Sequence, residues 1–323
     1  MGEWKMNRIR QALENTKQVR SFRFSSGKMF KNKDTGTLSS MDMNQTGNKM
    51  IYWAIFAVLL GVALICLLPP LWILLSSFKT HKELMEIPPR LLPTAYDFGK
   101  FADVWNKLKF GQYYLNTIIL AAGCVIFSVV FNGITGYVVS CLKPRGSAFI
   151  ITLIIWTMLL PNTLSMVPLF KNMIKLPLLG LNLTDTYWPM WLCAGANAFN
   201  ILLFKNSFDS LPVSLVEAAR LDGCGRIKVF SRIILPLSKP IIAVVAIFTV
   251  NSAWGDFLLP YLVLPSRSRQ TVMLQLYNAQ SSYSFPLDQQ LVSIVFAIFP
   301  PIIIFFIFQK YIMGGATLGA VSY

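Results

Sequence analysis

The sequence is poor in charge. Of its 323 residues, 13% are Asp, Glu, Lys or Arg, whereas 54% are hydrophobic. Soluble globular domains carry about 25% charged residues, so a water-facing surface over the whole chain is excluded. The net charge of +15 comes from few charges rather than from dense basic patches, which argues against nucleic-acid binding. The composition therefore predicts a protein embedded in a lipid bilayer.

The residues of metal, disulfide and hydrolytic chemistry are also scarce. The chain has one His, at position 81, and five Cys without a CxxC pair, which argues against a zinc site or a disulfide framework. No GxxxxGK[ST] phosphate-binding loop occurs, so the chain is not expected to bind or hydrolyse ATP. With a single His there is no catalytic constellation, and we expect neither an enzyme nor a bound cofactor or metal.

Long stretches without charge are abundant instead. A bilayer core about 30 Å thick needs roughly 20 apolar helical residues. We therefore expect an all-α fold with six membrane-spanning helices, near residues 51–77, 113–141, 147–169, 186–206, 236–263 and 290–312. Proline and polar residues interrupt the fourth and fifth of these, namely Pro189, Asn197, Asn200, Asn251 and Asp256. Such interruptions are tolerated where they face other helices or a cavity.

The distribution of charge predicts the orientation. Six spans place both termini on one side, which carries 19 basic and 7 acidic residues (net +12), against 10 and 7 (net +3) on the other. Basic residues favour the cytoplasmic side. We therefore expect a multi-pass protein of the cell (inner) membrane with both termini in the cytoplasm.

The chain begins with a basic tail, residues 1–49, that is poor in Leu, Ile and Val. This composition predicts disorder. Within it, residues 4–24 fit a basic amphipathic helix on anionic lipid, although a solvated tail that only sets orientation fits as well. We divide the chain into this tail and a membrane domain, residues 50–323.

The segment 211–240, LPVSLVEAARLDGCGRIKVFSRIILPLSKP, predicts a helix–turn–helix elbow between the fourth and fifth spans. Pro212 suits the first turn of a helix, and Gly223 and Gly225 end it. Apolar residues then return at helical spacing, at Ile227, Phe230 and Ile234. Such an elbow can transmit a push from a soluble partner into the membrane helices. An ordinary amphipathic helix at the membrane surface fits the pattern too.

The elbow sequence resembles the EAA loop of the permease subunits of binding-protein-dependent ABC importers. The matching positions are Glu217, Ala218, Ala219, Asp222, Gly223, Phe230, Ile233, Leu235, Pro236 and Pro240. In that family the loop forms the coupling helix that docks on a cytoplasmic ATPase subunit. The resemblance implies an ATPase contact at Glu217, Ala218, Ala219, Asp222 and Gly223.

Other stretches resemble the carbohydrate-importing branch of the family, the MalG-like subunits, and the likeness covers roughly residues 50–323. It is carried by Asn116-Thr117, Leu160-Pro161, Val167-Pro168-Leu169-Phe170, Phe199-Asn200, Phe308-Gln309-Lys310-Tyr311 and Gly319-Ala320-Val321. It implies a type I importer permease fold, a second permease subunit forming a heterodimer, and an extracytoplasmic solute-binding protein. It also implies two cytoplasmic ATPase subunits that hold ATP and Mg²⁺.

The resemblance further implies that a sugar or oligosaccharide moves into the cell by alternating access. Two alternatives remain open. The first is an importer of the same fold for a non-sugar solute such as a peptide, polyamine or phosphate. The second is a stand-alone secondary transporter or channel, which predicts ion-coupling carboxylates or matched broken helices.

Three residues of the fifth span are candidates for a translocation pathway. Asp256 is ionisable within an apolar run, which marks it as functional by default, unless it lies at the water-exposed end of the helix. Asn251 and Trp254 lie about one turn apart and suit a sugar chemically, but packing against a partner permease explains them equally. Gly255 stands where the family has Asn, and the chain ends in Ser322-Tyr323 where the family often has Lys-Gly.

Overall fold

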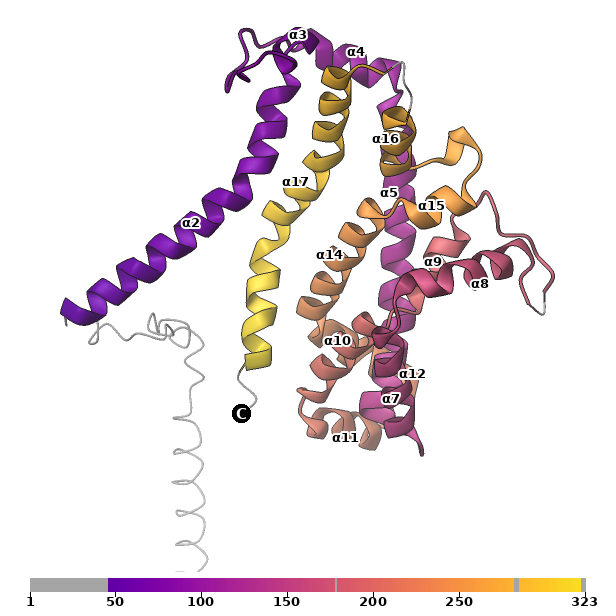
Figure 1. Ribbon diagram of the computed structural model, residues 1–323. Coiled ribbons are helices and arrows are strands. Elements are labelled where there is room, and N and C mark those ends of the chain that lie inside the picture. The colour runs from indigo at the N-terminus through magenta and orange to yellow at the C-terminus, as the bar shows by residue number, and fades with distance from the viewer. Residues whose placement is uncertain (1–45, 178, 282–284, 321–323) are drawn as a thin grey trace, which may run out of the picture. The chain divides into compact units, whose positions relative to one another are not determined.

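The computed structural model describes residues 46–177, 179–281 and 285–320, and this part of the chain is helical and contains no strand (Figure 1). The all-α prediction is therefore confirmed. The predicted tail, residues 1–49, lies almost entirely outside the described residues, and its amphipathic segment 4–24 lies wholly outside them.

The chain divides into two units, Met1–Pro69 and Pro70–Tyr323. The first contains most of α2 (Thr46–Ser77), whose apolar side chains are exposed along its length. The second contains, in chain order, α3 (His81–Leu84), α4 (Gly99–Lys107), α5 (Phe110–Phe127), η2 (Ser128–Asn132), α6 (Gly133–Tyr137), η3 (Val138–Leu142), α7 (Ser147–Leu159), α8 (Asn162–Ile174), α9 (Trp188–Gly195), α10 (Ala198–Asp209), α11 (Val213–Leu221), α12 (Arg226–Val229), η4 (Phe230–Ile234), α13 (Leu235–Leu237), α14 (Lys239–Gly255), α15 (Leu258–Val263), η5 (Arg267–Arg269), α16 (Val272–Gln280) and α17 (Leu287–Ala320).

Three described helices are long and apolar enough to cross a membrane: Lys49–Ser77, Phe110–Leu142 and Leu287–Gln309. They correspond to the first, second and sixth predicted spans. Two bent helix pairs raise the number to five if each pair is one span. The fourth predicted span corresponds to α9 and α10, which are not among these candidates. The count of six spans therefore stays a prediction.

The third and fourth predicted spans are not continuous helices. Residues 147–169 form α7 and most of α8, and the helix axis turns by 107° between them. Leu160 is extended (φ −85°, ψ 129°) because it precedes Pro161, whose ring disfavours a helical conformation there. The span near 186–206 breaks at Ala196 and Asn197, between α9 and α10. Breaks therefore lie at Leu160-Pro161 and at Asn197, whereas Asn200 lies inside α10.

The fifth predicted span is also shorter than expected. The helix α14 ends at Gly255, Asp256 is extended (φ −73°, ψ 123°), and α15 starts again at Leu258. Before α14, the axis of Arg226–Leu237 meets that of α14 at 80°. Within the predicted span 236–263, α14 is thus bounded by the bend at its start and by the extended residue Asp256 at its end.

Glycines let the helices of the second span approach their neighbours. A Cβ on Gly136 would lie 2.7 Å from the Cβ of Phe204 and 3.1 Å from the backbone nitrogen of Lys205, so α6 and α10 are in backbone contact. A Cβ on Gly123 would lie 2.1 Å from the indole Nε1 of Trp191. Small residues at helix crossings are the usual means of close packing in membranes.

The segment 79–107, called here the α3–α4 cap, is fixed by a buried carboxylate. Glu83 is 7% exposed and accepts hydrogen bonds from the backbone N–H groups of Thr80 (2.7 Å) and Thr94 (3.0 Å) and from the Thr94 hydroxyl. These hydrogen bonds lower the pKa of Glu83 to about 2, and the bond from the Thr94 hydroxyl contributes most. Lys100 ties the cap to α17 through an ion pair with Asp288 (3.2 Å).

Acidification is expected to loosen the α3–α4 cap. Because the pKa of Glu83 falls from 4.5 to about 2, the stabilisation it supplies is complete above pH 4.5 and is lost as the pH falls towards 2. The protection factors of the backbone amides of residues 80–94, which express the intrinsic exchange rate at each pH relative to the observed rate, should therefore fall over that range. Glu83→Gln, which does not titrate, should remove most of this pH dependence, and Asp97→Asn should leave it unchanged. Equal pH dependence in the native chain and in Glu83→Gln would contradict the assignment.

Candidate functional site: an elbow and a cavity

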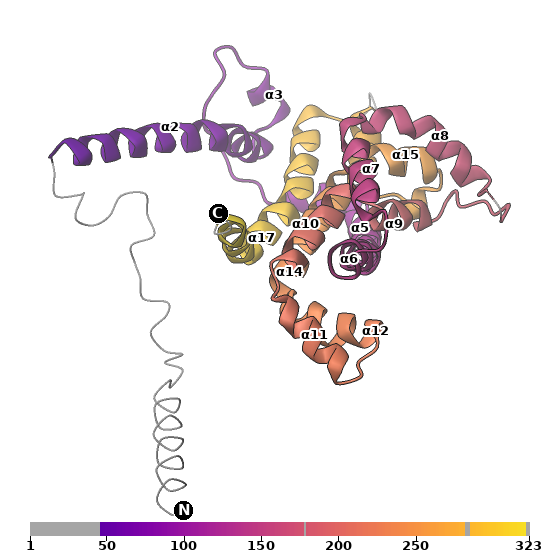
Figure 2. The ribbon, with the colours of Figure 1, turned by 90° about the horizontal axis from the view of Figure 1, so that it is seen from below.

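The segment 211–240 forms the predicted helix–turn–helix elbow. The first arm, α11, ends at Leu221 and is followed by Asp222 as its C-cap. Gly223 then turns the chain with a positive φ of 76°, which glycine adopts at least cost. The second arm runs through α12, η4 and α13 to Ser238, where α14 begins. Figure 2 shows α11 and α12 together at one edge of the second unit.

The two faces of the elbow differ. Val216 and Ala219 are buried and belong to a cluster with Tyr137, Phe204 and Phe208 of the membrane helices. The opposite face is open. Its exposed residues include Glu217, Ala218, Asp222, Gly223, Leu221 (89% exposed) and Ile227 (83%). Of the five residues predicted at an ATPase contact, four are thus accessible, whereas Ala219, 6% exposed, faces the core of its own chain.

A polar contact joins the elbow to the second predicted span, and another joins that span to the end of α10. The Tyr137 hydroxyl of α6 donates to the carbonyl of Arg226 in the elbow (3.2 Å). Beside it, Asp209 at the end of α10 accepts from the Ser140 hydroxyl of η3 (2.6 Å) and pairs with Lys205 (2.7 Å). The elbow is thus tied to the second predicted span, which is in turn tied to the end of α10.

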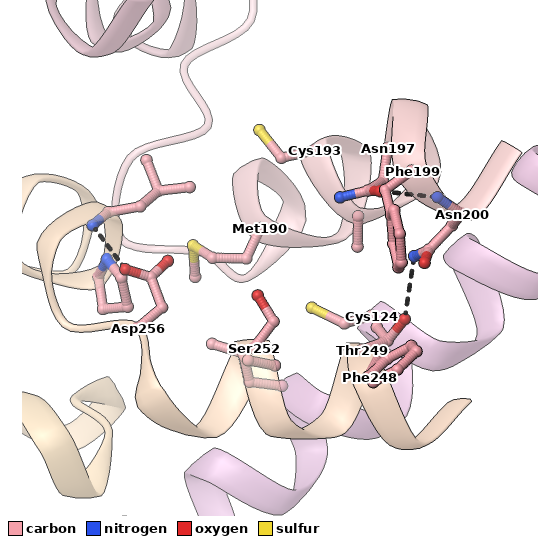
Figure 3. Close-up of a pocket in the computed structure, with 15 residues that line it drawn as sticks. Cys124, Met190, Cys193, Asn197, Phe199, Asn200, Phe248, Thr249, Ser252 and Asp256 are labelled. Atoms are coloured by element: carbon pink, nitrogen blue, oxygen red, sulfur yellow. Dashed lines mark hydrogen bonds between the residues drawn. The ribbon is translucent and has the colours of Figure 1, made fainter. Parts of the chain in front are cut away.

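A cavity of about 380 Å³ lies among α5, α9, α10, α14 and α15 (Figure 3). Its size is within the range of small-molecule sites. The lining residues are Leu120, Cys124, Met190, Cys193, Ala194, Asn197, Phe199, Asn200, Phe248, Thr249, Ser252, Ala253, Asp256, Leu259 and Pro260. The exposed rings of Phe199 and Phe248 meet edge to face, with centroids 5.8 Å apart.

The break between α9 and α10 is held by one side chain. Asn132, fully buried in η2, donates to the carbonyl of Ala194 (2.9 Å) and accepts from the N–H of Asn197 (3.1 Å). It thus replaces backbone bonds that the break removes, as a membrane interior requires. Asn200 and Ser128 extend the network, with a hydrogen bond of 3.0 Å between them.

Asp256 supplies the cavity with a carboxyl group. Its Oδ1 accepts from the N–H groups of Leu258 (3.1 Å) and Leu259 (3.4 Å) at the start of α15. Among the described residues that line the cavity, Asp256 is the one acidic residue, and none is Lys or Arg. Figure 3 shows its side chain at one end of the cavity, with Phe248 and Thr249 at the other.

The structure does not bring the three pathway candidates together. Asn251 is exposed and is not among the residues that line the cavity. Trp254 is 4% exposed and belongs to the hydrophobic core, and its indole N–H donates to the carbonyl of Ala297 in α17 (3.0 Å). Of the three, only Asp256 lines the cavity.

Sequence reasoning missed most of the polar lining of the cavity. The residues concerned are Asn197, Asn200, Thr249 and Ser252. A signal was present, since Asn197 and Asn200 interrupt an otherwise apolar stretch. Asn197 and Asn200 face the cavity because the chain breaks between α9 and α10. The sequence alone did not reveal which way these two side chains point.

Comparison with known proteins agrees with this architecture. A family model described as the binding-protein-dependent transport system inner membrane component matches residues 133–314. The chain belongs to this family. Membership makes the chain a transport component of an inner membrane rather than an enzyme, and it implies a partner permease, an ATPase and a solute-binding protein.

Relatives of this permease include two named for sugars. It is 30% identical to the arabinooligosaccharides transport system permease protein AraQ of Bacillus subtilis (strain 168), over 81% of this chain and 92% of AraQ. It is 29% identical to the diacetylchitobiose uptake system permease protein NgcG of Streptomyces coelicolor, over 81% and 86%. A chain of a bacterial ABC transporter involved in the import of the acidic polysaccharide alginate superposes with a TM-score of 0.70 at 27% identity, over 83% and 98%.

Removal of the Asn132 side chain is expected to destabilise the permease. Asn132→Leu leaves the Ala194 carbonyl and the Asn197 N–H without partners, which should cost about 2–4 kcal/mol. Thermal unfolding of the purified chain measures the loss. Asn106→Leu, at an exposed position of α4, should change stability by less than about 0.5 kcal/mol. Similar melting of the two variants would show that the network does not hold the break.

Proposed function

We propose that this chain is one permease subunit of an ATP-driven importer that moves a sugar or oligosaccharide into the cell. It pairs with a second permease subunit in a heterodimer, and two cytoplasmic ATPase subunits bind ATP and Mg²⁺. An extracytoplasmic solute-binding protein delivers the substrate. Both termini lie in the cytoplasm, on the side of the elbow. The observation that carries the proposal is the elbow, with an open face and a face packed into the membrane helices.

The elbow supports a coupling role. Glu217, Ala218, Asp222 and Gly223 supply small and acidic groups on the exposed face, and Leu221 and Ile227 supply apolar ones. A partner docked on this face would remove the side chains of Leu221 and Ile227 from water. On the other face, Ala219 packs in the cluster that contains Phe208 and Tyr137. ATP-driven movement of the ATPase subunits would push the elbow, and the buried face would carry the push into α6 and α10.

The cavity supports a place on the solute route. Sugars present apolar ring faces and many hydroxyl groups, and the cavity offers the rings of Phe199 and Phe248 beside amide, hydroxyl and carboxylate groups. Asp256 contributes a free carboxylate oxygen to this set. Asn251, exposed on α14 four residues before Gly255, lies at a position to contact a partner permease or a passing solute. The names of the relatives favour a carbohydrate over other solutes.

Charge reversal on the elbow tests the coupling role. Glu217→Arg should lower binding of the ATPase subunit about 30-fold or more, since interface centres carry most of the binding energy. Co-purification and substrate-stimulated ATP hydrolysis, measured with all subunits in nanodiscs, report the loss. Arg145→Glu, an exposed reversal outside the elbow, is the control. Intact binding and transport in Glu217→Arg would make the coupling role wrong.

The same assembly distinguishes the kinds of solute. Arabino-, chito- and uronic acid oligosaccharides are offered through the solute-binding protein, beside peptides, polyamines and phosphate. Stimulation of ATP hydrolysis by a carbohydrate is the expected result. Stimulation by a peptide, polyamine or phosphate alone would retain the importer and replace its substrate. Uptake without the ATPase subunits would favour a secondary transporter.

Removal of the Asp256 charge is expected to impair transport without unfolding the chain. Asp256→Asn keeps an oxygen that accepts from the N–H groups of α15, because Asn replaces Asp well at helix starts. We expect uptake to fall about 10-fold, the loss that a charged hydrogen bond of about 1.4 kcal/mol explains. Asp97→Asn is matched, since Asp97 also accepts from the N–H two residues later, at 2.8 Å. Unchanged uptake in Asp256→Asn would remove Asp256 from the route.

A further inference from the structure

The sixth span contains two adjacent prolines, Pro300 and Pro301, in the interior of α17. Proline has no backbone N–H, so it cannot donate to the carbonyl four residues earlier in a helix. Two carbonyl groups of α17, those of Phe296 and Ala297, therefore lack their helical donors. In apolar surroundings a carbonyl without a partner costs free energy, and it must find a donor elsewhere.

Two aromatic side chains from other helices supply the missing donors. The hydroxyl of Tyr114, in α5, donates to the carbonyl of Phe296. The indole N–H of Trp254, in α14, donates to the carbonyl of Ala297 at 3.0 Å. Each proline thus has one matching donor: Tyr114 serves the carbonyl freed by Pro300, and Trp254 serves the carbonyl freed by Pro301.

The two donors also support each other. The rings of Tyr114 and Trp254 meet edge to face, with centroids 5.5 Å apart and an interplanar angle of 81°. Trp254 and Ala297 are each 4% exposed, so their hydrogen bond is shielded from water. Three helices, α5, α14 and α17, consequently meet at this point, and they lie beside one another in Figure 1.

We infer that Tyr114 and Trp254 are positioning residues, which dock the sixth span onto α5 and α14 through the carbonyls that Pro300 and Pro301 release. The inference rests on the proposed function for its consequence in transport. Trp254 is in the last turn of α14, which ends at Gly255, and Asp256 is the first residue after the helix. Trp254 fixes the end of α14 on α17 and thereby determines the position of the Asp256 carboxylate in the cavity.

The pairing of donors with prolines makes the inference testable by matched and mismatched double variants. Tyr114→Phe removes one donor and retains the ring. Pro300→Ala restores a backbone N–H to the same carbonyl, of Phe296, whereas Pro301→Ala restores one to the carbonyl of Ala297. For Trp254→Phe the matched partner is Pro301→Ala and the mismatched partner is Pro300→Ala.

The first measurement is thermal unfolding of the full-length chain, purified with the subunits that accompany it. Each of Tyr114→Phe and Trp254→Phe should lower the melting temperature by roughly 2–6 °C. The matched proline substitution should recover most of that loss, and the mismatched one should not, after correction for each single proline variant. Equal recovery by both prolines, or by neither, would overturn the pairing. This result does not depend on which solute is carried.

The second measurement is uptake by the assembled importer. Trp254→Phe should lower uptake, and Pro301→Ala in the same chain should restore it together with the melting temperature. Recovery of melting without recovery of uptake would show that the docking is structural only and does not position Asp256. Absence of uptake of any sugar by the native importer, with the matched recovery of melting intact, would reject the proposed substrate and leave the docking in place.

Discussion

The need to satisfy every backbone polar group in an apolar interior governs this structure. A helix meets that need by itself only while it is unbroken. In this chain it is broken between α9 and α10 and weakened by Pro300 and Pro301 in α17. At both places a side chain from a neighbouring helix supplies the missing bonds: Asn132 bridges the break, and Tyr114 and Trp254 reach the freed carbonyls. The polar and aromatic residues of these spans thus hold the helices together.

The same constraint explains what the sequence predicted well. Runs without charge identify the first, second and sixth spans, because a helix in lipid needs little beyond length and apolar character. Gly223 and Pro212 marked the ends of α11, because the backbone conformations of these two residue types are narrow or unusual. The elbow and the all-α class therefore follow from local chemistry that a sequence records directly.

Tertiary partners explain what the sequence could not predict. Trp254 and Asp256 are two residues apart in the sequence, and the sequence predicts both on the translocation pathway. The structure buries Trp254 against α17 and leaves Asp256 on the cavity, because α14 ends between them at Gly255. Likewise Ala219 belongs to the EAA pattern yet faces inward, since α11 needs one apolar face against Phe208. Which side of a helix is buried depends on neighbours distant in the sequence.

The helix breaks at the start of α10 and at the end of α14 lie beside the cavity, where a transporter needs polar groups. An unbroken helix presents side chains alone, whereas a broken one also brings polar groups to the middle of the bundle, where a solute would meet them. The start of α10, with Asn197 and Asn200, and the end of α14, with Asp256, border one cavity. An apolar chain can hold such groups only if its intact helices are cross-linked around them. Asn132 joins the second predicted span to the fourth, and Tyr114 and Trp254 join the second and fifth to the sixth. The elbow packs on the second span and on α10, so the scaffold that tolerates the cavity is also the one that a movement of the elbow would reach.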